Sequence, residues 1–170
     1  MSGSLAISNF QRAVRLNTRL LRDVANWLLT EALALDEFDL AVCVVRAPEM
    51  ARLNETFLQH EGSTDVITFD YSDASSAAPR AASPSLHGEI FVCIDDAMAQ
   101  AREFRTSWQS ELARYVIHGV LHLRGYDDLN PADRRKMKRE ENRLLKQVTR
   151  LFPLNELGGN PGTTSRKIKN

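Results

Sequence analysis

The chain has 170 residues, 43% of them hydrophobic and 26% charged, a composition typical of one globular domain with a single core. Its 22 basic and 22 acidic residues cancel, which excludes a uniformly basic nucleic-acid coat protein but not a local basic face. The charge is uneven, because residues 1–85 carry 7 basic and 11 acidic residues, whereas residues 86–170 carry 15 and 11. We therefore expect an anionic partner to meet the second half of the chain.

Neither membrane insertion nor secretion is expected. The most apolar stretch, residues 24–35, contains Glu31 and is much shorter than the ~20 residues that a membrane-spanning helix needs. The first residues lack the charged-then-apolar layout of a secretory signal, so we expect a cytoplasmic protein. Cys43 and Cys93 lie in apolar runs, where a disulfide could join them but buried, reduced thiols are favoured.

The first half of the chain predicts a helix, two strands and a short helix. Apolar residues recur at helical spacing through residues 10–35 and predict one long helix. Residues 38–45 and 65–71 are rich in apolar, β-branched and aromatic side chains, which predicts two buried strands. Pro48 suits the first turn of a short helix that continues through Phe57.

The middle of the chain predicts a loop between strands. Residues 72–87 are rich in Ser, Ala and Pro, which indicates a mobile loop rather than a domain boundary. Residues 88–94 predict a third strand, and Asp95 is expected to cap a following helix that ends near Phe104.

Two further helices complete the predicted domain. Ser107 is placed to cap a long apolar-periodic helix, and a last helix is expected from near Pro131 to about Leu151. Together the elements predict a single α/β (α+β) domain over residues 1–157, with a small mixed sheet of about four strands covered by helices. The Gly-, Ser- and Lys-rich residues 158–170 are expected to be a disordered tail.

A pair of histidines carries the clearest chemical signal. His118 and His122 are four residues apart on the long helix, so they lie about 40° apart around its axis and can point at one ion, as in zincin-like helices. Gly125 follows where the helix should end and can adopt the positive φ that reverses the chain. This reversal would bring Asp128 back toward the histidines.

We predict that His118, His122 and Asp128 bind one metal ion per chain. Zinc suits two imidazoles and a carboxylate best, although nickel or copper would bind them in vitro. Three protein ligands leave a fourth position for water, the arrangement of a catalytic site. Metallopeptidases share this histidine spacing, but they need a glutamate directly after the first histidine as general base. Gly119 occupies that position here, which argues against a peptidase.

Three segments resemble one known family. Residues 118–128 read HGVLHLRGYDD and resemble H-G-x-L-H-L-x-G-Y-D-H, the signature of the YbeY family of bacterial endoribonucleases, the rRNA maturation factors. Residues 64–69 (TDVITF) resemble the family segment T-D-V-L-S-F, and residues 88–95 (GEIFVCID) resemble G-D-I-x-I-S-x-D. The segments follow the family's order, and the resemblance covers roughly residues 40–150.

This resemblance implies a zinc-dependent, single-strand-specific endoribonuclease, a hydrolase in which zinc-bound water attacks an RNA phosphodiester. It further implies a role in 16S rRNA 3′-end maturation and ribosome quality control, with rRNA and the small ribosomal subunit as partners. The family's metal ligands carry over to His118, His122 and Asp128. We expect the chain to act as a monomer.

The chain departs from the family pattern at two positions. Asp128 stands where the family commonly has histidine, and we expect the ion to be retained because carboxylates also bind zinc. Leu58 stands where many members carry an arginine thought to contact RNA. We expect either that this contact passes to Arg124 or Arg52 or that the activity is weak.

The sequence leaves several roles open. Asp127 and Asp65 are both candidates for a general base, and neither is assigned. The basic run 134–139 is either a solvated helix face or a contact with RNA phosphates. His60 and His87 are expected in loops, and if either completed the metal shell, a non-catalytic ribosome assembly factor with a structural zinc would be favoured. An open coordination position would favour the enzyme.

Overall fold

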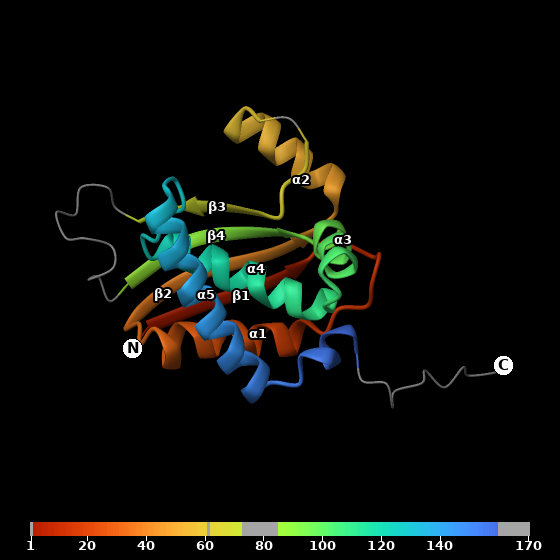
Figure 1. Cartoon of the computed structure of the whole chain (residues 1–170). Helices are drawn as coiled ribbons and strands as arrows, with labels where there is room; N and C mark the ends of the chain where they lie inside the picture. The colour runs from red at the N-terminus through yellow and green to blue at the C-terminus, as the bar shows by residue number, and fades with distance from the viewer. Residues whose placement is uncertain (1, 61, 73–84, 160–170) are drawn as a thin grey trace.

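A four-stranded mixed sheet lies at the centre of the molecule (Figure 1). The computed structural model describes residues 2–60, 62–72 and 85–159. The strand order is β1-β2-β4-β3, in which β1, β2 and β4 are parallel and the edge strand β3 is antiparallel to β4. The strands are β1 (Ser2–Asn9), β2 (Glu37–Val45), β3 (Val66–Asp70) and β4 (Ser85–Cys93). The predicted α/β fold with about four strands is confirmed.

Helices cover one face of this sheet more completely than the other. Alternate side chains of β2 and β4, such as Val42 and Ile90, are fully buried in one core with α1 and α4. A smaller cluster around Met50 and Ile67 packs α2 against the opposite face. The helices are α1 (Thr18–Trp27), α2 (Ala47–Leu53), α3 (Ile94–Phe104), α4 (Trp108–Leu123) and α5 (Pro131–Leu151), with π-helical turns η1 (Leu28–Ala32) and η2 (Asn54–Leu58) and the 3-10 helix η4 (Leu154–Gly158).

The N-terminal region corrects the prediction of one helix over residues 10–35. The helix begins only at Thr18, where the Asn17 side chain accepts a hydrogen bond from the Leu20 N–H at 3.1 Å. Residues 2–9 form the edge strand β1, which pairs with β2 in parallel. Its small and polar residues carry little strand signal, so the pairing with β2 decides its conformation.

The helices after β2 agree better with their predicted caps. Pro48 lies in the first turn of α2, and the Ser107 hydroxyl accepts a hydrogen bond from the Ser110 N–H at 3.1 Å at the start of α4. The last helix has the bounds that were expected, Pro131–Leu151. Capping residues and a proline in the first turn are strong local signals, which explains this agreement.

Asp95 does not cap its own helix as predicted. The helix α3 begins at Ile94, two residues before the start that an Asp95 cap implies, and its N-cap residue is Cys93. The Asp95 carboxylate instead accepts hydrogen bonds from the Ala47 N–H at 2.6 Å and from Arg46 Nε at 3.0 Å. The Arg46 hydrogen bond, together with that of Ala47, lowers the pKa of Asp95 below its usual value. Asp95 thereby ties α3 to the start of α2.

Other predictions agree with the structure only in part or fall outside the described residues. The strand β4 begins at Ser85, so the last three residues of the expected loop 72–87 are strand, and residues 73–84 lie outside the described residues. Residues 160–170 of the expected tail also lie outside them. Cys43 and Cys93 are free and buried, and burial raises the pKa of Cys43 to about 11. In the described part of the chain, no helix is long and apolar enough to cross a membrane.

Candidate metal centre

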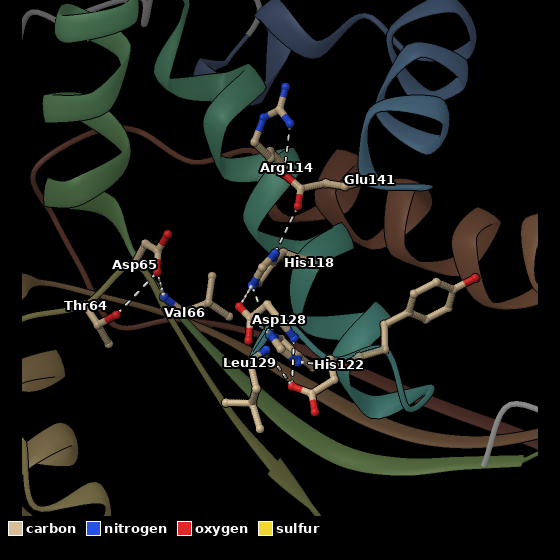
Figure 2. A network of polar contacts seen from close by, with 11 residues as sticks. Thr64, Asp65, Val66, Arg114, His118, His122, Asp128, Leu129 and Glu141 are labelled. Carbon is tan, nitrogen blue, oxygen red and sulfur yellow. Dashed lines mark hydrogen bonds and ion pairs between the residues drawn. The ribbon is translucent and has the colours of Figure 1, made fainter. Parts of the chain in front are cut away.

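The predicted metal ligands come together at the C-terminal end of α4 (Figure 2). The Nε2 atoms of His118 and His122, one helical turn apart, are 3.1 Å from each other. Gly125 has a φ of +94°, and its N–H donates to the carbonyl of His122, which ends the helix. After this reversal, Asp128 Oδ2 lies 3.7 Å from His122 Nε2 and 4.0 Å from His118 Nε2.

Asp127 holds the turn that presents Asp128. Its Oδ1 accepts hydrogen bonds from the backbone N–H of Asp128 at 2.7 Å and of Leu129 at 3.2 Å. An aspartate in this position acts like a cap of the turn. Asp127 therefore has a structural task beside the metal ligands, which makes it the weaker of the two candidates for a general base.

The second nitrogen of each imidazole meets an acceptor. His118 Nδ1 lies 3.0 Å from Glu141 Oε2, and His122 Nδ1 lies 3.1 Å from the carbonyl oxygen of Tyr126. A carbonyl and an ionised carboxylate accept but do not donate, so both Nδ1 atoms carry the proton. Both Nε2 atoms are then left to present lone pairs toward the Asp128 carboxylate. This donor set of two imidazoles and one carboxylate fits a divalent zinc-like ion.

Glu141 is the hydrogen-bonding partner that orients the His118 imidazole. Its side chain is 5% exposed, and its Oε1 accepts a hydrogen bond from Arg114 Nη1 at 2.8 Å. Burial alone would raise the pKa of Glu141, but the hydrogen bonds from His118 and Arg114 outweigh burial and lower it. We call this series Arg114–Glu141–His118 the buried charge chain.

The two histidines have different proton affinities. Burial opposes the charged form of His118, but the hydrogen bond to Glu141 outweighs it and raises the pKa of His118. Burial and the neighbouring His118 lower the pKa of His122. His122 is therefore held neutral, which is the form that binds a metal ion.

Neither Glu141 nor Arg114 is among the site residues predicted from the sequence. Glu141 closely follows the basic run 134–139 in the sequence, but it lies on the buried stripe of α5 with Met137, Leu144 and Val148. A carboxylate at helical spacing among buried apolar residues is the signal that could have found it, because an unpaired charge is rarely buried. No comparable signal marks Arg114, since its role depends on where α5 packs.

A cavity of about 540 Å³ opens beside the metal ligands, between α4 and α5. His118, Asp128 and Tyr115 line it, and the buried Tyr115 hydroxyl has no hydrogen-bonding partner among the described residues. Asp65 also lines the cavity, although its Oδ1 accepts hydrogen bonds from the Val66 N–H at 2.9 Å and the Thr64 hydroxyl at 3.3 Å. Of the two candidate bases, Asp65 lines this cavity and Asp127 does not.

The structure places neither of the arginines predicted to contact RNA on this cavity. Arg124 is buried, and its Nη1 donates to the Ser85 carbonyl at 3.2 Å. Arg52 is exposed on α2, where it forms an ion pair with Glu49. Leu58, at the end of η2, does not line the cavity either. The RNA-contacting role of these arginines stays a prediction, without support from the geometry.

The remaining histidines lie away from the metal ligands. The expectation of a loop at His87 is wrong, since it lies on β4, with its Nε2 3.5 Å from Asp39 Oδ2 and its ring against Tyr71. His60 follows the π-helical turn η2. Within the described ranges, the group of residues that could hold a metal ion contains His118, His122 and Asp128 and no fourth ligand.

Gly119 provides a packing argument against peptidase chemistry. A Cβ atom at this position would lie 2.7 Å from Ile90 Cγ2 on β4. The helix α4 therefore approaches the sheet so closely that any side chain at this position would force Ile90 to shift. The glutamate that a metallopeptidase needs after its first histidine would overpack this contact.

Comparisons with known proteins agree with this geometry. The chain is 40% identical over 97 residues to endoribonuclease YbeY of Salinibacter ruber, which covers 57% of this chain and 62% of that relative. It is 29% identical over 143 residues to endoribonuclease YbeY of Parabacteroides distasonis, covering 83% and 94%. The chain thus spans less than two thirds of the first relative and nearly all of the second.

A solved structure has a similar fold. The solution structure of TM1509 from Thermotoga maritima superimposes with a TM-score of 0.59 over 98% of this chain and 99% of that one, at 24% identity. The family model described as "Endoribonuclease YbeY" matches residues 6–149, which is well over half of the chain. The chain therefore belongs to the endoribonuclease YbeY family.

Proposed function

We propose that this chain is a metal-dependent endoribonuclease that holds one zinc ion with His118, His122 and Asp128 and cleaves single-stranded RNA. The proposal extends to 16S rRNA 3′-end maturation and ribosome quality control in the cytoplasm, by a monomer that meets the small ribosomal subunit. Family membership supports the reaction class. The convergence of His118 Nε2, His122 Nε2 and Asp128 Oδ2 beside an open cavity is the observation that carries the metal site.

The residues of the chain prepare the site in separate ways. Glu141 and the Tyr126 carbonyl fix the imidazole orientations, so that both Nε2 atoms face Asp128. When bound, the ion supplies Lewis-acid chemistry, which activates water and polarises a phosphodiester oxygen. Asp65, on the cavity wall, is the carboxylate we assign to receiving the proton that the attacking water loses.

The same observation supports the enzyme over an assembly factor with a structural zinc. A structural zinc site is closed by four protein ligands, whereas a catalytic site keeps one position open. The described residues offer three ligands, and the cavity adjoins them. This arrangement favours the enzyme.

Metal content and cleavage of a single-stranded rRNA fragment test this proposal when measured together. We expect one zinc per chain, loss of cleavage on chelation and its return when zinc is added. His122→Ala should remove metal and cleavage together, whereas His87→Ala, a matched change on β4, should remove neither. Metal retained at one per chain in His122→Ala would show that the ligand assignment is wrong. One zinc without any cleavage would favour the assembly factor.

A further inference from the structure

Three basic residues of α5 stand out on the cavity wall. Arg134, Arg135 and Lys138 line the cavity together with His118 and Asp128. All three are exposed, and in the described part of the chain their side chains form no ion pair or hydrogen bond with another residue. We call them the α5 cations. Charged side chains that the fold leaves unpaired beside a candidate active site are available for a ligand.

The charge balance of the cavity favours an anionic ligand. Arg114 is the fourth cation that lines the cavity, but its Nη1 forms an ion pair with Glu141 Oε1 at 2.8 Å. The remaining carboxylates are Asp65 and Asp128, and the charge of Asp128 is offset once a divalent ion is bound. The α5 cations then exceed the one unpaired carboxylate, Asp65, by two charges, so the filled site attracts polyanions.

The spacing of these residues suits a phosphate chain. Residues 134, 135 and 138 lie on adjoining positions of two helical turns, and a rise of 1.5 Å per residue separates the first from the last by about 6 Å along the axis. Cations in such a row can meet neighbouring phosphates of one strand. Contacts of this kind position a nucleic acid without reading its bases.

We propose that Arg134, Arg135 and Lys138 form a backbone-phosphate subsite that holds single-stranded RNA along α5 and leads it to His118, His122 and Asp128. This inference deepens the proposed function and rests on it, because it takes RNA as the substrate. The α5 cations are positioning residues that bind non-scissile phosphates and take no part in bond cleavage.

Salt-dependent RNA binding tests the subsite. The triple variant Arg134→Gln/Arg135→Gln/Lys138→Gln is compared with Arg139→Gln/Lys146→Gln/Arg150→Gln, which removes the same charge from exposed positions of α5 off the cavity. Fluorescence anisotropy follows a labelled single-stranded RNA with a cleavage-resistant phosphorothioate backbone at several salt concentrations, on zinc-loaded protein, because the charge balance is that of the filled site. Thermal unfolding checks that both variants fold.

The subsite predicts a change in slope as well as in affinity. Each phosphate contact to a single strand contributes about 0.7 to the slope of log K against log salt, so the cavity variant should lower that slope by about two. The loss should be equal for oligo(A) and oligo(U). The control variant should retain most of the wild-type slope.

Failure of the subsite and failure of the proposed function are distinguishable. Equal slopes for the two triple variants, or a wild-type chain that binds no RNA at low salt, would overturn the subsite even if zinc-dependent cleavage is seen. A slope lost only in the cavity variant supports the subsite, and absence of zinc-dependent cleavage by the wild type would then count against the enzyme alone.

Discussion

One helix, α5, supplies two sets of charged residues to the same cavity, and the sets differ in almost every physical respect. Glu141 is 5% exposed and is satisfied by Arg114 and His118. The α5 cations, at most two turns away, are exposed and unpaired among the described residues. The buried charge chain fixes geometry, because the buried Glu141 carboxylate holds His118 and Arg114 at once, and moving it leaves His118 without its acceptor. The side chains of the α5 cations form no ion pair or hydrogen bond among the described residues, so they are available to bind a ligand.

The largest loss of stability is expected when Glu141, the centre of the buried charge chain, is removed. Glu141→Ala leaves His118 without its acceptor and Arg114 with Asn142 Oδ1 alone, at 2.8 Å. Loss of one partner from a buried pair costs about 3–5 kcal/mol of unfolding free energy, and we expect about 3 kcal/mol because both partners of Glu141 are about a quarter exposed. Urea denaturation measures the loss. Glu140→Ala is the matched control, since Glu140 pairs with the exposed Arg143, and its effect should stay within about 1 kcal/mol. Equal losses in the two variants would refute the contrast.

The helix α4 packs closely against β4 at Gly119, the residue after His118. Gly119→Ala places a Cβ 2.7 Å from Ile90 Cγ2, and overpacking of this kind costs about 1–3 kcal/mol of unfolding free energy. Ile90→Ala removes the contacting atoms. The double variant should therefore be less destabilised than the sum of the two single variants, as measured in a double-mutant cycle. Simple additivity would show that the contact is absent.

The ion pair of Asp95 has intermediate exposure and should have an intermediate effect. Asp95→Ala removes the hydrogen bonds from Arg46 and the Ala47 N–H, a loss of about 1 kcal/mol that thermal or urea unfolding at neutral pH would detect. The Arg46 hydrogen bond lowers the pKa of Asp95 in the folded state. The stabilisation is thus present above the unfolded pKa of about 3.9 and is lost as the pH falls through the folded value.

The difference between wild type and Asp95→Ala should therefore shrink when the same unfolding experiment is repeated in strong acid. A difference that stays constant down to acid pH would mean that the charge of Asp95 contributes nothing. Asp96→Asn is a suitable comparison, because burial raises the pKa of Asp96 instead of lowering it. Its carboxylate should not show the same loss with acid.

The smallest effect on folding is expected for the α5 cations. Arg134→Gln/Arg135→Gln/Lys138→Gln should leave the unfolding free energy within about 0.5 kcal/mol of wild type, because these exposed side chains form no ion pair or hydrogen bond among the described residues. Urea denaturation of this variant beside Glu141→Ala compares the two sets of charges directly. A loss of several kcal/mol would show that the cations belong to the fold.

Local signals account for what was predicted correctly around the site. Helical spacing places His118 and His122 on one face, and Gly125 predicts the reversal that returns Asp128. The start of α5 at Pro131 follows from the preference of proline for a first helical turn. In each case the deciding contact joins residues within a few positions of one another, so the sequence contains both partners side by side.

Long-range packing accounts for the errors. The strand β1 exists because β2 offers it a partner, and Asp95 turns from its own helix to the start of α2, 48 residues earlier in the chain. Arg124 looks like an available cation in the sequence, but the turn after α4 buries it against the β4 carbonyl of Ser85. None of these partners lies near its residue in the chain.

The sequence by itself determined the three candidate metal ligands, the helix that carries two of them and the glycine turn that returns the third. Only the tertiary structure decided that Glu141 orients His118, that Arg114 holds Glu141, and that the α5 cations share a cavity with Asp128. The reason is physical: helix geometry fixes spacing over one or two turns, whereas the partner of a buried charge depends on how separate helices pack.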